Sequence, residues 1–234
     1  MKYYFVKLII TSGLLLFYAN NAEGHDYWQQ RVVYDMNVNF DVKNHQFTGD
    51  QTLQYYNNSP DTLYNIYYHL YFNAFQPNSM MDVRSRTIAD PDGRVGSRIA
   101  GLQPDEIGYL KVDELVQGNT PLTYDVSETV LEVSLAEPLP PGANTTFKMK
   151  FNGQVPVQIR RSGRDNLGGV DYSMAQWFPK LAEYDEMGWH TTPYVGREFH
   201  APWGDYDVKI TIDKDYVIAG TGILQNPNEI GYGY

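Results

Sequence analysis

The sequence contains no cysteine, which excludes disulfides, thiolate nucleophiles, cysteine-ligated zinc and iron–sulfur clusters. It is also poor in basic residues, with 18 Lys and Arg against 28 Asp and Glu, a net charge of −10. Such a balance repels phosphate backbones, so no nucleic-acid partner is expected. Long hydrophobic runs are absent as well. The most apolar stretch, residues 8–18, is shorter than the roughly 20 residues that a membrane-spanning helix needs.

The N-terminus has the pattern of an export signal. Lys2 and Lys7 precede the apolar stretch, and the small-residue segment 19–22 follows it. A basic head, a short apolar core and a small-residue exit are typical of a secretory signal peptide. We therefore predict that residues 1–22 are a signal peptide and that the protein is exported, to the periplasm or the extracellular space. After signal cleavage no membrane span is expected.

Aromatic residues are frequent, at 15% of the chain, and 20 of them are tyrosines. Aromatic side chains favour β-strands. Near the start of the mature chain, the apolar residues Met36, Val38 and Phe40 alternate with the polar residues Asn37 and Asn39. A period of two predicts a strand with one buried and one solvated face.

Further strands are predicted along the rest of the chain. Residues 47–56, within which Gly49 suggests a β-bulge, and residues 63–72 follow the first strand through turn-rich segments. The other expected strands are short and comprise residues 109–116, 122–126, 129–135, 145–151, 206–212 and 217–222. The proline-rich run 137–142 is expected to separate two of them.

Regularly spaced short strands indicate one all-β domain, an antiparallel saddle-like sheet or sandwich, over residues 23–225. Residues 78–101 are interpreted as a long surface excursion, and no amphipathic helix of ten residues is expected. Residues 226–234 are interpreted as a truncated connector. Its apolar residues Ile230, Tyr232 and Tyr234 favour a domain that continues into another one over a self-contained module.

The common hydrolase motifs are absent. The sequence contains neither H-E-x-x-H, which binds zinc from one helix face, nor the G-x-S-x-G elbow of serine hydrolases. His190 and His200 lie near Asp205 and Asp207, so a site of two histidines and one carboxylate is conceivable. That spacing matches no rigid element, and we assign no metal ligands and no catalytic residues.

Glycosidase chemistry needs two carboxylates that face each other across about 5–9 Å. Glu183, Asp185 and Glu186 are close enough in sequence to be candidates. Acids that lie together in one loop usually remain solvated, so no such role is assigned.

The most distinctive segment runs from residue 176 to residue 206. Trp177, Phe178, Trp189 and Trp203 occur there among prolines and glycines, in backbone that is expected to be irregular. One interpretation is a hydrophobic plug that fixes a long loop against the sheet. The other is a binding wall for sugars or peptides, with Trp177, Trp189 and Trp203 as the ligand surface.

The same segment carries a resemblance to a known family. Five residues followed by the strand 205–212 match a motif of that family: Gln176, Pro179, Asp185, Glu186 and Phe199. The chain here resembles the N-terminal domain of the aminopeptidase N-like zinc metallopeptidases. Residues 34–42, 47–49, 56–59, 63–70 and 216–222 are similar to other strands of that domain, and residues 69–75 are similar to its secreted bacterial branch.

The resemblance implies a non-catalytic β-domain that covers the active-site cleft of an aminopeptidase. In the family, the zinc ligands and the catalytic base belong to a following helical domain. Zinc and peptide substrates are therefore expected in a domain outside this sequence, no cofactor is expected within it, and the chain alone is expected to be inactive. The alternative is a self-contained secreted β-sandwich module that binds glycans or peptides.

The resemblance also bears on two residues of the motif. Gln176 and Phe178 are expected at the edge of the cleft. Many family members have Glu or Gln at the position of Phe178, where it helps to hold the free amine of the substrate. Phenylalanine has no polar group for that task, so the amine-anchoring role does not carry over to this chain.

Overall fold

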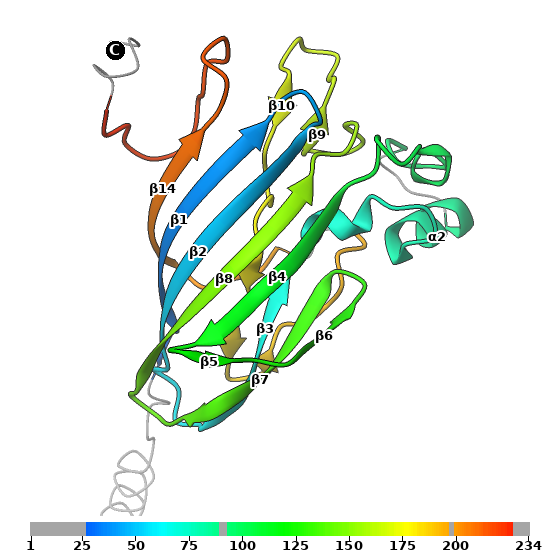
Figure 1. The fold of residues 1–234 in the computed structure, drawn as a ribbon. Coiled ribbons are helices and arrows are strands. Elements are labelled where there is room, and N and C mark those ends of the chain that lie inside the picture. The colour runs from blue at the N-terminus through cyan, green and yellow to red at the C-terminus, as the bar shows by residue number, and fades with distance from the viewer. Residues whose placement is uncertain (1–26, 89–92, 197–198, 227–234) are drawn as a thin grey trace, which may run out of the picture.

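The computed structural model describes residues 27–88, 93–196 and 199–226, and these form an all-β fold, as the sequence predicts (Figure 1). Within these residues, helix is confined to α2 (Met80–Thr87) and to two 3-10 turns, η1 (Tyr71–Ala74) and η2 (Ile99–Gly101). The expected signal peptide and all but the first residue of the expected connector lie outside the described residues.

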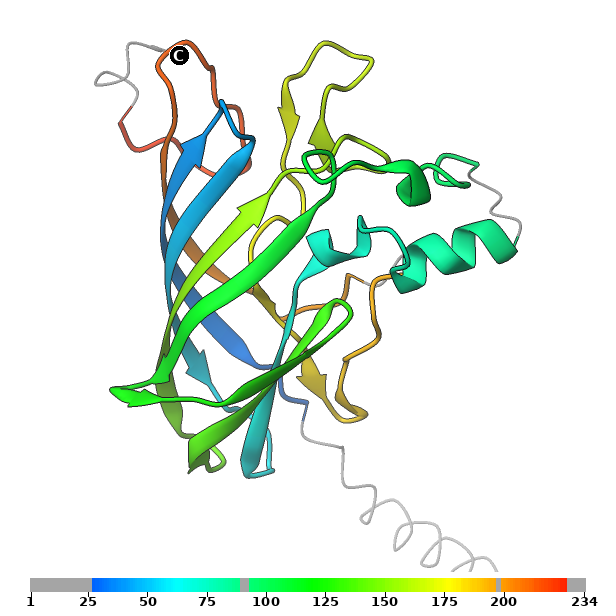
Figure 2. The ribbon, with the colours of Figure 1, turned by 45° about the vertical axis from the view of Figure 1, so that its right-hand side comes forward.

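The larger sheet has six strands in the order β14-β1-β2-β8-β4-β5. They are β1 (Arg31–Asp41), β2 (Gln46–Tyr56), β4 (Tyr109–Gln117), β5 (Thr120–Pro121), β8 (Asn144–Gln154) and β14 (Gly204–Thr211). All neighbours are antiparallel except β1 and β14, which run parallel. The long strands form one strongly twisted wall, with β14 and α2 on opposite sides of the molecule (Figures 1 and 2).

A smaller sheet of four strands completes the main architecture. Its order is β11 (Lys180–Leu181), β3 (Leu63–His69), β7 (Val130–Leu139) and β6 (Tyr124–Ser127). Two short hairpins accompany it, one formed by β9 (Gly163–Arg164) with β10 (Tyr172–Ser173) and one by β12 (Tyr184–Asp185) with β13 (Gly188–Trp189). The small sheet stands opposite the lower part of the large one (Figure 2).

The alternation in β1 fixes which face of the large sheet is buried. Val32, Tyr34, Met36 and Val38 are at most 4% exposed, whereas the polar residues between them face solvent. Residues two apart on a strand share a face, so this row points into the core. The sequence-based prediction of a half-buried first strand is confirmed.

The predicted bulge at Gly49 is wrong. The register from β1 through β2 to β8 continues without interruption across Gly49, which pairs with Val38 on one side and Phe151 on the other. The ring of Phe151 lies directly over this glycine, and an added Cβ would be 2.2 Å from its Cζ. Glycine is therefore required here by the close approach of a ring.

Three other predictions about the middle of the chain need correction. Segment 78–101 forms α2 and η2 and is not purely superficial, because Met81, Val95 and Ile99 are fully buried in the core. The third predicted strand, 63–72, ends at His69, where the chain turns into η1. Strand β7 continues to Leu139 and so includes the first part of the proline-rich run that was expected to end it.

At the end of the described chain, the strand predicted at residues 217–222 does not form. Val217 is 68% exposed and Ile218 42% exposed, so these side chains lack the packing that holds a strand in a sheet. Strand β14 is consequently the last strand of its sheet among the described residues. No helix in the described part of the chain has the length and hydrophobicity to cross a membrane.

Candidate functional site

The segment that carries the sequence motif connects the two sheets. Its residue Leu181 donates a backbone N–H to the hydroxyl oxygen of Tyr34 in the large sheet, at 3.0 Å, and pairs within β11 with β3 of the small sheet. Gln51 of the large sheet donates its side-chain amide to the carbonyl oxygen of Pro179, also at 3.0 Å. These buried hydrogen bonds fix the backbone of the segment against both sheets.

The first residues of the motif lie against the large sheet. Gln176 is half-buried and has a positive φ of 59°, and it precedes two aromatic side chains that pack inward. The ring of Trp177 lies 5.8 Å from that of Phe47, and the ring of Phe178 lies 5.6 Å from that of Tyr34. Both arrangements are edge-to-face, the favoured geometry of aromatic pairs. Trp177 and Phe178 thus anchor the loop to the sheet.

The three tryptophans proposed as a ligand surface have different environments. Trp177 and Trp189 are half-buried and take part in aromatic packing, whereas Trp203 is 81% exposed. The ring of Trp189 lies 5.1 Å from Tyr184 and 5.5 Å from Tyr67. Of the three, Trp203 offers the most open ring to a ligand.

The hairpin β12–β13 determines which side chains of the segment come together. Tyr184 pairs with Trp189 and Asp185 with Gly188, and the backbone N–H of His190 donates to the carbonyl oxygen of Glu183 at 2.9 Å. Paired residues of antiparallel strands point to the same side, and successive residues alternate. The register therefore places the side chains of Glu183, Asp185 and His190 on one side of the hairpin.

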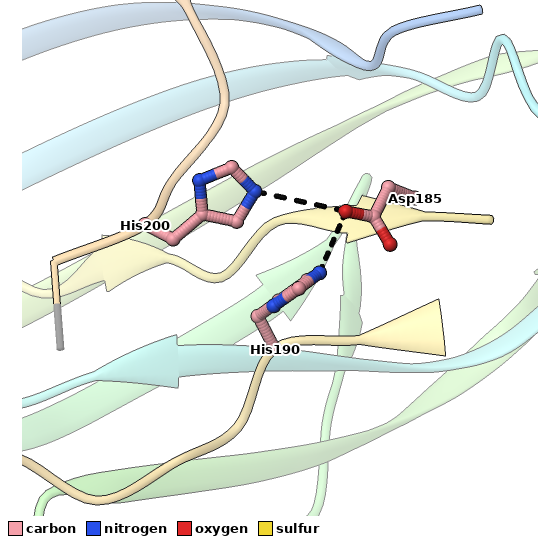
Figure 3. A group of neighbouring side chains, drawn as sticks. All are labelled: Asp185, His190 and His200. Atoms are coloured by element: carbon pink, nitrogen blue, oxygen red, sulfur yellow. Dashed lines mark hydrogen bonds and ion pairs between the residues drawn. The ribbon is translucent and has the colours of Figure 1, made fainter. Parts of the chain in front are cut away.

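Asp185, His190 and His200 form a compact cluster on this side (Figure 3). The Nε2 atom of His190 lies 2.7 Å from Oδ2 of Asp185, and Nε2 of His200 lies 3.7 Å from the same oxygen. The centroids of the two imidazole rings are 4.6 Å apart. Two imidazoles and a carboxylate that converge in this way form a ligand set that suits divalent transition metals.

Burial and hydrogen bonding tune the charged groups in and beside the cluster. Burial by itself raises the pKa of Asp185. Hydrogen bonds from the Met187 N–H and from His190, together with the charges of His190 and His200, outweigh this effect, so the pKa lies below its usual value. Burial raises the pKa of Glu183 to about 7. Asp185 thus carries the firmer negative charge of the two.

His69 supports the cluster from the small sheet. Its Nε2 atom lies 3.1 Å from the carbonyl oxygen of His190, so in the neutral ring this nitrogen carries the hydrogen. Burial lowers the pKa of His69 to about 4, which keeps the ring neutral at physiological pH. The contact helps to fix the backbone of His190 and, through it, the direction of its side chain.

The carboxylate partner of the two histidines differs from the one that the sequence suggested. The sequence offered Asp205 and Asp207, whereas the structure brings Asp185 to them. Asp205 instead forms an exposed ion pair with Arg31 at 3.1 Å. The missed signal is the short hairpin, which sets Asp185 beside His190 and in which Gly188, the first residue of β13, has a φ of 93°.

Of the known proteins compared with this chain, solved structures resemble it, whereas family models and curated sequences do not. No family model matches the sequence, and no curated protein matches it. An M1 zinc metallopeptidase from Deinococcus radiodurans is 16% identical over 83% of this chain and 35% of its own, with a TM-score of 0.49. A mutant M1 zinc metallopeptidase from the same organism, bound to a Tyr-Ser-Ala substrate, gives the same identity and coverage with a TM-score of 0.48.

A third structure, of a two-domain M1 zinc metallopeptidase mutant bound to L-tryptophan, is 17% identical over 64% of this chain and 27% of its own, with a TM-score of 0.39. The chain thus spans about a third of the length of the first structures that it matches. Likeness at this level does not establish membership of a family, and what those proteins bind or cleave remains a property of those proteins.

Proposed function

We propose that this chain is the N-terminal β-domain of an exported zinc aminopeptidase, has no hydrolytic centre of its own, and covers the active-site cleft of a catalytic domain in the same protein. The motif from Gln176 to Phe199 supports the choice of family. The observation that carries the proposal is an apolar row on β14 that continues the buried face of the large sheet but is left uncovered.

That row is defined by the parallel register of β1 and β14. Three buried residues of β1 each pair with an apolar residue of β14, namely Tyr34 with Tyr206, Met36 with Val208 and Val38 with Ile210. The β1 residues are at most 4% exposed, whereas the β14 residues are 38–44% exposed. The core-facing side of the sheet therefore continues from β1 onto β14, where the described part of the chain leaves it partly exposed. An exposed apolar surface of this kind marks an interaction site.

The motif segment borders this uncovered row. The ring of Phe178 lies 6.2 Å from the ring of Tyr206, which in turn stacks on Tyr34 at 4.9 Å. A domain that covered Val208 and Ile210 would thus also meet the stretch from Gln176 to Phe178. This is the arrangement expected if those residues edge a cleft shared by two domains.

The occupant of the row is, in this proposal, the remainder of the same polypeptide. The exposed apolar residues are not confined to β14, because Val217, Ile218, Ile223 and Leu224 are 42–85% exposed on the chain that follows it. An edge strand with apolar neighbours is prone to aggregation unless further structure covers it. Coverage by a catalytic domain removes that liability and closes the cleft.

The interface is tested by placing a charge on either face of β14 in the native protein. Ile210→Asp puts a carboxylate into the uncovered row, and Lys209→Asp puts one on the opposite, polar face of the same strand. We expect Ile210→Asp to separate the domains, seen as faster limited proteolysis between them and lower aminopeptidase activity, and Lys209→Asp to do neither. Equal behaviour of the two variants would contradict the interface.

The absence of a hydrolytic centre is tested with the purified chain alone. We expect the zinc-loaded chain to hydrolyse an aminoacyl-p-nitroanilide no faster than the blank. Hydrolysis well above the blank that is lost with a chelator would overturn this part of the proposal.

The exposure of Trp203 favours one second candidate, a module that binds glycans or peptides. Trp203 is 81% exposed, and its open indole ring can pack against a sugar ring or a peptide side chain. A glycan-array signal that disappears in Trp203→Ala would favour this function over the peptidase domain.

A further inference from the structure

We propose that Asp185, His190 and His200 bind a divalent transition-metal ion, with zinc as the best-suited occupant. The proposal rests on side chains of this chain alone and does not depend on the function proposed above. Binding would tie the β12–β13 hairpin to the segment that leads into β14, because His200 lies between the hairpin and that strand.

The distances within the cluster are close to those of a metal site. One donor atom from each residue, Oδ2 of Asp185 among them, lies within 4.8 Å of the other two. Zinc bonds to nitrogen and oxygen of about 2.0–2.2 Å at tetrahedral angles place the ligand atoms about 3.3 Å from one another. The 2.7 Å contact to His190 would open slightly and the 3.7 Å separation from His200 would shorten slightly.

His200 adds a third donor atom to the pair formed by Asp185 and His190. A hydrogen bond between Asp185 and His190 fully accounts for their distance of 2.7 Å. The second imidazole points its Nε2 atom at the same carboxylate oxygen from 3.7 Å, beyond hydrogen-bonding distance (Figure 3). Two ring nitrogens that face one carboxylate oxygen converge as the ligands of a cation do.

Contacts around the cluster hold its ligands in place. Oδ1 of Asp185 accepts the backbone N–H of Met187 at 2.8 Å, which leaves Oδ2 facing the histidines. The backbone of His190 is fixed on both sides, by its N–H to Glu183 and by its carbonyl oxygen to His69. Such supporting hydrogen bonds are the usual means by which proteins orient metal ligands.

The donor set and its exposure indicate the class of ion. Imidazole nitrogens favour zinc and neighbouring transition metals over magnesium and calcium, which prefer oxygen ligands. The side chains of Asp185 and His190 are each 32% exposed and that of His200 is 59% exposed, so an ion can reach the cluster from solvent. Three protein ligands also leave a coordination position for water or another ligand.

The test is a calorimetric titration of the chain, purified without a histidine tag and stripped with a chelator, with zinc ions. We expect one zinc per chain, and cobalt in its place should give the visible d–d absorption bands of a cobalt ion bound by nitrogen and oxygen ligands. His190→Ala, His200→Ala and Asp185→Asn should each weaken zinc binding at least 10-fold. Magnesium and calcium should not compete.

Two matched variants serve as controls. Glu186→Gln removes a carboxylate from the exposed turn next to Asp185, and His45→Asn removes a histidine at a turn of the large sheet where φ is 57°, a conformation that asparagine tolerates. Both should bind zinc like the parent chain. If His190→Ala does not fold, the exposed His200 provides the informative variant. Lack of stoichiometric binding by the parent, or undiminished binding by His200→Ala, would overturn the proposal.

Discussion

Replacing Gly153 by alanine is expected to destabilise the large sheet, because the ring of Phe47 occupies the space above this glycine. Gly153 of β8 pairs with Phe47 of β2, and an added Cβ would lie 2.4 Å from Cζ and 2.9 Å from both Cε atoms of that ring. Carbon atoms in good contact are about 3.5–4.0 Å apart. The ring would therefore have to move by more than about 1 Å.

Phe47 has little freedom to make that movement. It is 2% exposed, and four other rings surround it, at centroid distances of 5.8–6.4 Å: Phe40, Phe72, Phe151 and Trp177. Overpacking of a filled core costs about 1–3 kcal/mol. Glycine-to-alanine replacement also lowers the conformational entropy of the unfolded chain, which stabilises the folded state by about 0.4–1 kcal/mol. We expect a net loss of about 1–2 kcal/mol in the free energy of unfolding.

The assay is urea or thermal unfolding of the parent chain and of the Gly153→Ala variant. For a protein of this size the loss corresponds to a melting temperature lower by about 2–8 °C. Phe47→Leu should relieve the overlap, so Gly153→Ala combined with Phe47→Leu should lose less stability than the two single changes added together. Gly220→Ala is the control, because an added Cβ there would meet no heavy atom within 4 Å. Gly153→Ala as stable as Gly220→Ala would refute the reasoning.

Two further predictions concern the segment that joins the sheets. Tyr34→Phe removes the acceptor of the buried Leu181 N–H and should lower the free energy of unfolding by about 1–3 kcal/mol in urea titrations, whereas an unchanged midpoint would show that this bond does not hold the segment. Trp189→Ala should lower the free energy of unfolding by about 2–3 kcal/mol, because its ring packs against Tyr55 of the large sheet and Tyr67 of the small sheet. Trp203→Ala removes a largely exposed ring and should change the free energy of unfolding by no more than about 0.5 kcal/mol. The same thermal melts separate the two tryptophans, and equal losses would contradict the structure.

The regular strands were accessible from the sequence because each has one buried and one solvated face. Alternation of apolar and polar residues is enough to locate β1, and its continuation in β2 follows from the same period of two. Gly49 shows where this reasoning stops. A glycine in a strand fits a bulge and a close approach equally well, and only the register, which brings Phe151 over it, distinguishes them.

The candidate site was less accessible, because its residues come together through a hairpin with two-residue strands. Periodicity cannot be recognised over two residues, so the sequence predicts irregular backbone around Asp185 and His190, where the structure has β12 and β13. The aromatic residues Tyr184 and Trp189, which pair across the hairpin, are the sequence signal that was available. The sequence does group His190 with His200, but it offers Asp205 and Asp207 as their partner because the hairpin that brings Asp185 to them leaves no local pattern.

The strand predicted at residues 217–222 was wrong for a related reason. Its apolar composition fits a strand, but a strand also needs a neighbour and a packed face, and β14 and the residues after it remain exposed. Local propensity cannot supply packing that the surrounding structure does not provide.

The central claim is that this β-domain works as part of a larger zinc aminopeptidase. The most direct test is the length and sequence of the native polypeptide, determined by mass spectrometry of the protein captured with an antibody against residues of the large sheet. We predict a polypeptide that continues beyond Tyr234 into a helical region containing H-E-x-x-H. A native polypeptide that ends at Tyr234 would contradict the claim.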